Sequence, residues 1–134
     1  MKLYIAGPMS QLPEFNYPAF MDAERQLVAS GYEVENPARP GQVDGWTWRD
    51  YMKRGIRQML DCEGVALLPG WQHSRGAQIE AALATQFGMR LWSVDMWEQA
   101  AHRRRLADHA RGDGLTAGAD SSPNKTAAKL EGDR

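Results

Sequence analysis

The stretch Gly64-Val65-Ala66-Leu67-Leu68, closed by Pro69-Gly70, is the most continuous apolar run in the chain. A run of this kind, bounded by residues that break regular structure, is typical of a central strand that is covered on both faces of a parallel sheet. A second run, Leu3-Tyr4-Ile5-Ala6, stands near the N-terminus and is closed by Gly7 and Pro8. It predicts a buried first strand.

Helical and strand patterns alternate along the rest of the chain up to about residue 106. Apolar residues recur at helical spacing after Pro18 and stop at Gly31, and the alternating segment Tyr32-Glu33-Val34-Glu35 predicts a second strand. The later predicted segments are a helix ending at Leu60, a helix over 76–87, a strand over 91–94 and a helix ending near Leu106. The expected helix N-caps are Asn16, Asp44 or Thr47, Ser74 and Asp95. The helix ending at Leu60 is expected to present one apolar face made of Tyr51, Met52, Ile56, Met59 and Leu60.

This alternation of strands and helices predicts one α/β domain. Strand-helix repeats of this kind build a flavodoxin-like or Rossmann-like, doubly wound parallel sheet, here of about four to five strands. The length of 134 residues agrees with a single domain. Past Ala107 the composition changes to Gly, Asp, Ser, Lys and Ala. The domain is therefore predicted over 1–107, with a flexible polar tail over 108–134.

Charge and composition narrow the class of partner. Sixteen Lys and Arg against seventeen Asp and Glu leave a net charge of −1, which gives no general attraction to a nucleic acid polymer or an acidic membrane. No apolar run approaches the roughly 20 residues that span a bilayer. The N-terminal apolar stretch is interrupted by Gly7 and Pro8, unlike a secretory signal, so a cytoplasmic protein is expected.

The cysteine and histidine residues give no indication of a metal or redox centre. With Cys62 as the single cysteine, neither an intrachain disulfide nor a cysteine zinc site is possible, and a small buried residue is expected there. The three histidines, His73, His102 and His109, show no metal-ligand spacing, and no metal or organic cofactor is predicted. The cluster Arg103-Arg104-Arg105 is expected at the end of the last helix, where cations suit the helix dipole; a phosphate or partner contact is the alternative.

The loops that follow the strands are the places to look for a site. In an open parallel sheet, ligands bind beyond the carboxyl ends of the strands, which puts the loops 7–16, 36–45 and 69–76 there. In the third loop, Ser74 and Gly76 stand where a helix begins, so unpaired backbone N–H groups and a hydroxyl could hold an anion. Ser74 can equally be a plain N-cap. The segment Gly7-Pro8-Met9-Ser10 could present further N–H groups, although it is neither a Rossmann fingerprint nor a P-loop.

Glu80 is the candidate for acid chemistry. Helical spacing puts Gly76, Ala77 and Glu80 on one side of the same helix, so the carboxylate can face the crevice that the helix N-terminus faces. The alternative is an ordinary surface glutamate favoured by the helix dipole.

Two of these segments also resemble a known family. The stretch Leu3-Tyr4-Ile5-Ala6-Gly7-Pro8-Met9, followed by Ser74-x-Gly76-Ala77-x-x-Glu80, resembles the nucleoside 2-deoxyribosyltransferase-like superfamily and, more narrowly, the small bacterial and phage proteins grouped as DUF4406. The resemblance covers roughly residues 1–97. It implies cleavage or exchange of N-glycosidic bonds, with Glu80 as the nucleophile that forms a covalent glycosyl-enzyme. It also implies a homodimer or larger homo-oligomer. The substrate-binding residues expected are Tyr4, Gly7, Pro8, Met9, Ser10, Trp71, Ser74, Gly76 and Ala77.

The resemblance also indicates a phosphorylated substrate. Superfamily enzymes acting on free nucleosides carry a carboxylate six residues before the nucleophile, whereas the nucleotide hydrolases carry a serine there, as this chain does at Ser74. A hydroxyl at a helix N-terminus can donate to a phosphate that a carboxylate would repel. Related sequences tend to have an Asp where Gly55 stands, and Asp61 and Glu63 lie near the other end of the third strand. The acid that protonates the leaving base is therefore unassigned.

Three functions remain open at this point. The first is an N-glycosidase or deoxyribosyltransferase acting on a nucleoside 5′-monophosphate, most simply a deoxynucleotide. The second is a non-catalytic nucleotide-binding protein, a sensor or sequestering partner. The third is a phosphoribohydrolase of the lysine-decarboxylase-like group, although its Gly-Gly-x-Gly-Thr element is absent here. The five tryptophans fit an interface, a core or a base-stacking role equally: Trp46, Trp48, Trp71, Trp92 and Trp97.

Overall fold

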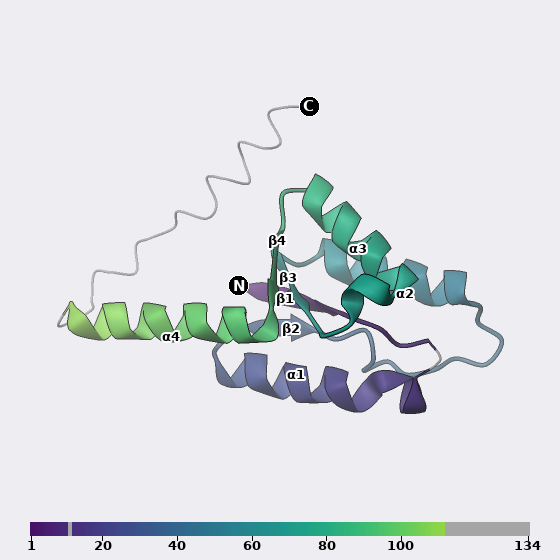
Figure 1. Ribbon diagram of the computed structural model, residues 1–134, viewed down its shortest axis with the longest axis horizontal. Helices are drawn as coiled ribbons and strands as arrows, with labels where there is room; N and C mark the ends of the chain where they lie inside the picture. Colours follow the sequence, from purple (N-terminus) through teal and green to yellow (C-terminus); the bar gives the residue numbers. More distant parts are fainter. Residues whose placement is uncertain (11, 112–134) are drawn as a thin grey trace.

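The computed structural model, which describes residues 1–10 and 12–111, contains a four-stranded parallel sheet. Its strands lie in the order β2-β1-β3-β4 (Figure 1). The two apolar runs form the central strands β1 (Lys2–Ala6) and β3 (Gly64–Leu67), and β2 (Glu33–Glu35) and β4 (Arg90–Ser93) form the edges. The chain moves from β1 to β2 in one direction and from β3 to β4 in the other. The predicted doubly wound sheet is confirmed, with four strands.

Helices cover both faces of this sheet (Figure 1). The helices α1 (Tyr17–Ala29) and α4 (Val94–Ala110) pack on one face, and α2 (Trp48–Leu60) and α3 (Arg75–Gln86) pack on the other. Two short 3-10 helices, η1 (Pro13–Asn16) and η2 (Trp71–His73), lie in the loops after β1 and β3.

Side-chain alternation along β1 divides the core into two clusters. Leu3 and Ile5 point toward α1 and α4, where they join Phe20 and Trp97. Tyr4 and Ala6 point toward α2 and α3. This alternation puts a tyrosine hydroxyl on the α2–α3 side of the sheet, and the site described below depends on it.

Two of the predicted N-caps are confirmed. The Ser74 side chain accepts a hydrogen bond from the Ala77 N–H at 3.2 Å at the start of α3. At the start of α2, Thr47 and Asp50 form a capping box, in which the Thr47 N–H donates to the Asp50 carboxylate at 2.9 Å. The loop-to-helix transitions that frame the cavity below are therefore held by local hydrogen bonds.

One predicted cap is wrong, and another is confirmed only in its position. Helix α4 begins at Val94, so Ser93 takes the N-cap position and accepts from the Met96 N–H at 3.1 Å, while Asp95 lies in the first turn. Asn16 occupies the N-cap position of α1, in a left-handed conformation, but its side-chain amide donates to the Pro8 carbonyl at 2.9 Å and makes no capping hydrogen bond. That bond ties the loop after β1 back onto itself.

The last helix is longer than predicted. It runs to Ala110, so the cluster 103–105 lies inside it and not at its end. Arg104 donates to the Tyr32 hydroxyl and Arg105 to the Ser30 carbonyl, each at 3.2 Å, so both side chains fasten α4 to the segment between α1 and β2. Every residue from 102 to 110 is exposed, and this half of α4 projects beyond the sheet (Figure 1). Most of the predicted tail, 112–134, lies outside the described residues.

Candidate active site

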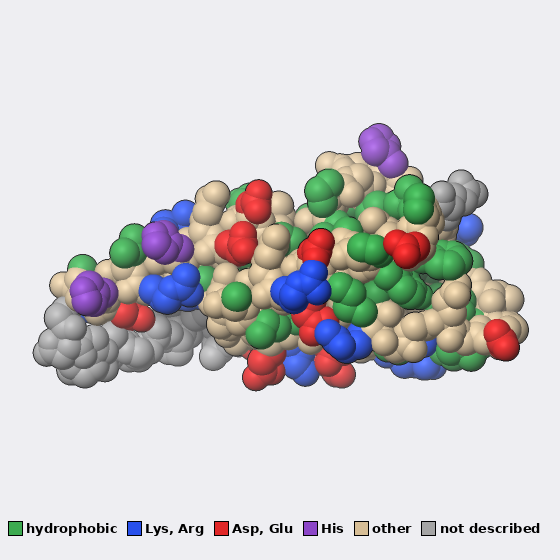
Figure 2. All heavy atoms as spheres, turned by 90° about the horizontal axis from the view of Figure 1, so that it is seen from below, with side chains coloured by type: hydrophobic (Ala, Val, Ile, Leu, Met, Phe, Trp, Pro, Cys, Tyr) green, Lys and Arg blue, Asp and Glu red, His purple; other side chains and the backbone are tan. Residues whose placement is uncertain are grey.

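A cavity of about 660 Å³ lies at the carboxyl ends of β1 and β3, where the strand order reverses. Doubly wound sheets bind their ligands at this position. The loop after β1, the start of α1, the N-terminal half of α2 and the first two turns of α3 line it. Figure 2 shows hydrophobic side chains gathered toward the right-hand end of the molecule, the end at which β1 finishes in Figure 1.

Glu80 lies inside this cavity, paired with a tyrosine. Its exposed fraction is 6%, and that of Tyr4 is 1%. The Tyr4 hydroxyl donates a hydrogen bond to Glu80 Oε2 at 2.7 Å. The position follows from the second turn of α3, which faces β1, and from the alternation that turns Tyr4 toward α3. The surface alternative for Glu80 is therefore wrong, and the prediction that Gly76, Ala77 and Glu80 share the cavity side of α3 is confirmed.

The surroundings change the acid strength of both groups. Burial raises the pKa of Glu80 from 4.5 to about 7, although the hydrogen bond from Tyr4 lowers it in part. Burial also raises the pKa of Tyr4 well above its ordinary value of 10.0, and the Glu80 charge raises it further. Tyr4 thus stays a hydrogen-bond donor near neutral pH, while Glu80 changes between carboxylic acid and carboxylate there. A carboxyl group poised in this way is typical of acid–base or nucleophilic chemistry.

Gly55 of α2 closes the far side of this pair. A Cβ atom at residue 55 would stand 2.7 Å from the Tyr4 hydroxyl oxygen and 3.0 Å from Glu80 Oε2. Both distances are shorter than normal contacts, so any side chain there would displace the pair. The space that an aspartate would need is occupied by the Tyr4–Glu80 hydrogen bond.

The N-terminus of α3 forms one end of the cavity. Ser74, Gly76 and Ala77 all line it, and the first N–H groups of a helix have no partner within the helix. Because the Ser74 hydroxyl accepts from Ala77, its own hydrogen remains free to be donated. The helix dipole adds a partial positive charge at the same place. This end of the cavity suits an anion.

Two arginines that the sequence reading did not single out also line the cavity. The Arg54 guanidinium donates to the Gly41 carbonyl at 2.7 Å and lies 4.9 Å from the centre of the Trp46 ring. The Arg75 guanidinium lies 4.2 Å from the centre of the Trp48 ring. Among residues 1–10 and 12–111, neither arginine forms an ion pair with a carboxylate. The cavity therefore combines one buried acid with two uncompensated cations.

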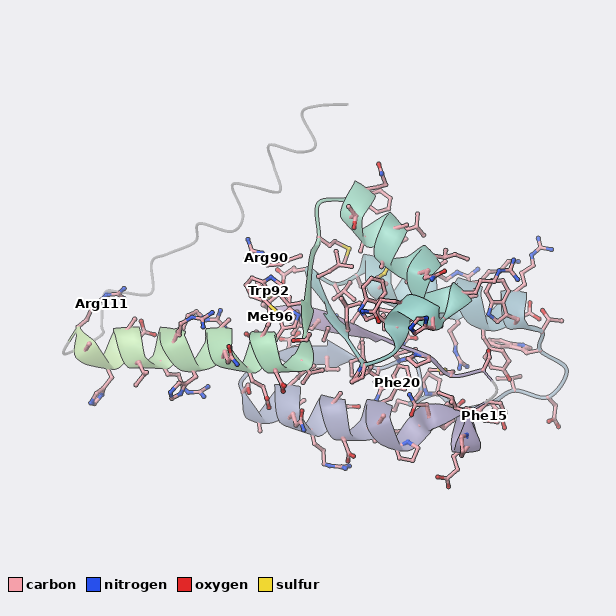
Figure 3. The ribbon with its side chains drawn as sticks, viewed as in Figure 1. Phe15, Phe20, Arg90, Trp92, Met96 and Arg111 are labelled. Carbon is pink, nitrogen blue, oxygen red and sulfur yellow. The ribbon has the colours of Figure 1, made fainter. Side chains whose placement is uncertain are left out.

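Aromatic side chains from η1, α1 and α2 form another part of the cavity wall. Phe15, Tyr17 and Phe20 reach the cavity from η1 and α1, and Tyr51 reaches it from α2. Figure 3 labels Phe15 and Phe20, which lie at the end of the molecule where α1 begins. Flat apolar surfaces of this kind are suited to a planar ring.

A family model described as "Domain of unknown function (DUF4406)" matches residues 1–93. The chain belongs to the DUF4406 family. The matched region includes every residue that lines the cavity, from Tyr4 to Glu80. No curated protein matches the chain.

Most residues predicted for the site of this DUF4406 protein do meet in the cavity. Gly7, Pro8, Met9 and Ser10 line it together with Tyr4, Ser74, Gly76, Ala77 and Glu80. Trp71, also predicted as a binding residue, is not among the residues that line it. The 3-10 turn η2 directs its ring toward the core, where it packs, half-buried, against the cluster that contains Met59 and Val65.

The α2 wall of the DUF4406 cavity comes in part from the apolar face predicted for this helix. Tyr51 and Met52 belong to that predicted face, and both are half-buried and line the cavity, whereas Leu60 of the same face is 52% exposed. A signal was present in the sequence. Trp48, Met52 and Gly55 follow one another at helical spacing, so a single face of α2 reaches from the rim of the cavity down to Glu80.

Three further features, a cysteine, metal-ligand clusters and membrane-spanning helices, can be described for the same residues. Cys62 is buried, and burial raises the pKa of its thiol to about 12, as befits an inert core residue. Across residues 1–10 and 12–111, no three or more His, Cys, Asp or Glu side chains are grouped so as to hold a metal ion. Nor does any helix of that part of the DUF4406 chain combine the length and apolar character needed to cross a membrane.

Proposed function

We propose that this DUF4406 protein cleaves or exchanges the N-glycosidic bond of a nucleoside 5′-monophosphate, most simply a deoxynucleotide, with Glu80 as the nucleophile. The observation that carries the proposal is one buried carboxyl group in the same cavity as the N-terminus of α3. The likeness of residues 3–9 and 74–80 to the nucleoside 2-deoxyribosyltransferase-like superfamily supports the same function. The volume of about 660 Å³ lies within the range of roughly 300–1,000 Å³ usual for small-ligand sites.

The first chemical step forms a covalent sugar ester. A carboxylate oxygen of Glu80 bonds to the anomeric carbon as the C–N bond breaks, and the bonding pair leaves with the base. The cationic character of the sugar in the transition state is stabilised by the same carboxylate. The Tyr4 hydroxyl holds Oε2 at 2.7 Å, which fixes the carboxylate plane and leaves Oε1 for attack. Water, or a second base, then releases the sugar from Glu80.

The phosphate would bind at the N-terminus of α3. The free N–H groups of α3 and the Ser74 hydroxyl hydrogen can donate to it, and Arg75 adds a positive charge at the same helix end. Binding energy gathered at a remote phosphate holds the sugar against Glu80, which lowers the barrier to attack. Ser74 is thus both the cap of α3 and a substrate ligand.

A non-catalytic nucleotide-binding protein is the second candidate. The observation that favours it is Gly55, which supplies no acid for the leaving base. The same cavity would then hold a nucleotide without breaking it.

The test is base release from a panel of deoxynucleoside 5′-monophosphates and free deoxynucleosides, measured by chromatography. Glu80→Gln is expected to lower the rate at least about a thousandfold, whereas the control Glu98→Gln on α4, outside the cavity, should leave it unchanged. Because attack needs the carboxylate, kcat/KM should rise with pH through about 7. Mass spectrometry of the wild-type protein should detect the covalent sugar adduct.

The other outcomes discriminate between the candidates. Tight nucleotide binding without base release would establish the binding protein and reject the enzyme. Neither binding nor release would overturn both. Equal release by the wild type and Glu80→Gln would reject Glu80 as the nucleophile.

A further inference from the structure

The departing base needs a group that takes up or stabilises its negative charge, and Gly55 has no side chain that could do so. When the C–N bond breaks, the base takes the electron pair and acquires negative charge unless an acid protonates it at once. No carboxyl group can fit at residue 55 while Tyr4 and Glu80 keep their hydrogen bond. The tyrosine is itself a poor proton donor, because burial raises its pKa well above 10.0. A cation placed beside the base would serve instead.

Sheet order indicates where the base would lie. The strands follow the order β2-β1-β3, so the loop after β2 and the N-terminus of α3, which follows β3, lie on opposite sides of β1. If the phosphate binds at α3 and the sugar lies over Glu80, the base extends toward the loop after β2. Pro37 from that loop and Tyr17 from α1, both half-buried, line this side of the cavity. Their flat rings fit a nucleobase.

Arg54 lies on this same side. Its side chain donates to the carbonyl of Gly41, in the loop after β2, and it lines the cavity. Its positive charge acts on the hydroxyl groups of both Tyr4 and Tyr17, in each case opposing the pKa rise that burial causes. Arg54 directly precedes Gly55, which packs against Tyr4 and Glu80, and its guanidinium lies 5.4 Å from the centre of the Tyr51 ring in the aromatic wall. A guanidinium carries five N–H donors, and the Gly41 carbonyl occupies one of them.

We propose that Arg54 donates hydrogen bonds to a ring carbonyl oxygen of the departing base, so that the site selects nucleotides whose base carries such an oxygen. The inference rests on the proposed function and names its substrate class: nucleotides of oxo-bearing bases such as uracil, thymine, hypoxanthine and guanine. Adenine, which has no ring carbonyl, is the poor substrate.

The step balances with water as its only other reactant. Glu80 donates an electron pair to the anomeric carbon, the C–N pair moves onto the base, and the resulting anion is delocalised onto the carbonyl oxygen that Arg54 contacts. Water then protonates the base after it leaves. A second water molecule hydrolyses the sugar ester: its oxygen stays on the anomeric carbon, its released proton neutralises the hydroxide left by the first water, and Glu80 is again a carboxylate. Arg54 stays protonated throughout, because its pKa lies far above neutral pH.

The experiment compares two leaving groups on the same sugar phosphate. In 5-fluoro-dUMP the fluorine makes the base anion more stable than in dUMP, so its departure needs less help. Arg54→Gln is expected to lower kcat/KM for dUMP by about a hundredfold, the usual effect of removing one transition-state donor, and by less than about tenfold for 5-fluoro-dUMP. The matched control is Arg57→Gln, an exposed arginine one turn further along α2 that does not line the cavity. It should change both rates less than twofold.

Several results would overturn the inference. Equal losses on both nucleotides, with no loss on unphosphorylated deoxyuridine, would make Arg54 a phosphate ligand. An unchanged rate in Arg54→Gln would show that Arg54 does not assist the departing base. Wild-type turnover of dAMP as fast as that of dUMP would show that the site does not select bases with a ring carbonyl.

A second variant covers the case in which Arg54→Gln does not fold. Arg54→Lys keeps the charge but loses the planar arrangement of N–H donors. It should therefore lower kcat/KM for dUMP more than for 5-fluoro-dUMP, as Arg54→Gln does. Equal effects on the two nucleotides would count against the proposal. Absence of base release from every nucleotide by the wild type would instead reject the proposed function, and this inference with it.

Discussion

Gly55 shows how one missing side chain can shape a site. A glycine inside a helix usually lowers stability by about 0.5–1 kcal/mol relative to alanine, so replacing it is normally favourable. Here the added methyl group would meet the Tyr4 hydroxyl at 2.7 Å and Glu80 at 3.0 Å. Both of those side chains are buried and hydrogen-bonded to each other, so neither can move without cost.

We therefore expect Gly55→Ala to destabilise the protein by about 1–3 kcal/mol, as overpacking of a core does, and to reduce base release. Urea unfolding measures the first effect. Gly76→Ala in α3 is the matched control, because its Cβ meets the end of the flexible Met52 side chain, which can move. A Gly55→Ala protein as stable as the wild type would show that the pair is not tightly enclosed.

At the scale of the element, α3 and α4 offer a matched pair of helix caps. Ser74 accepts from Ala77 at 3.2 Å and Ser93 accepts from Met96 at 3.1 Å. Only Ser74 lines the cavity. The two serines should therefore be alike in their contribution to stability and different in their contribution to binding.

Ser74→Ala and Ser93→Ala are each expected to cost about 1 kcal/mol of unfolding free energy, the usual value of a lost cap. Ser74→Ala should in addition raise KM for a deoxynucleoside monophosphate by about tenfold, while Ser93→Ala leaves KM unchanged. Denaturant unfolding and steady-state kinetics on the same preparations check both parts. If KM rises equally in the two variants, Ser74 acts only as a cap and the phosphate binds elsewhere.

The elements also show what a sequence can and cannot predict. Strands β1 and β3, the cap at Ser74 and the cavity side of α3 follow from local patterns, because apolar runs and helical spacing are local properties. The cap of α4 is Ser93 and not Asp95, because the helix begins two residues earlier than predicted and both residue types are good N-caps. Trp71 lies in the short 3-10 turn η2, which no local pattern predicts, and it packs against the core cluster that contains Met59.

The contacts between elements could not be predicted from local sequence patterns. Spacing along α3 could place Glu80 toward the crevice, but nothing near Glu80 in the sequence indicates Tyr4 as its partner. Arg54 was overlooked for a similar reason, since its role depends on a loop carbonyl at Gly41 and on the way α2 crosses the end of β1. These are consequences of packing, and they become visible only when the helices are in place on the sheet.

At the scale of the whole molecule, the buried carboxyl group couples stability to pH. The folded protein retains a proton on Glu80 up to about pH 7, whereas the unfolded chain releases it near 4.5. Between these values the folded state binds more protons than the unfolded state, so stability must fall as pH rises. Above about 7 this contribution is constant, and the ionised carboxylate that the proposed attack requires is present at its full energetic cost.

Glu80→Gln should therefore be more stable than the wild type at pH 8, by up to about 3 kcal/mol, and indistinguishable from it near pH 4. Unfolding free energies measured across this range test the expectation, with Glu98→Gln as the reference for losing a carboxylate elsewhere. A variant that is less stable at pH 8 would mean that the Glu80 carboxylate is stabilised by its surroundings and not strained by them.

The hydrogen bond between Tyr4 and Glu80 joins residues 76 positions apart. During synthesis the tyrosine leaves the ribosome long before its acceptor exists, and β1 cannot complete its surroundings until β3 and α3 have followed. A nascent chain carries no acid site at all until α3 emerges and docks. Whatever chemistry the cavity performs is thereby withheld until the domain is essentially whole.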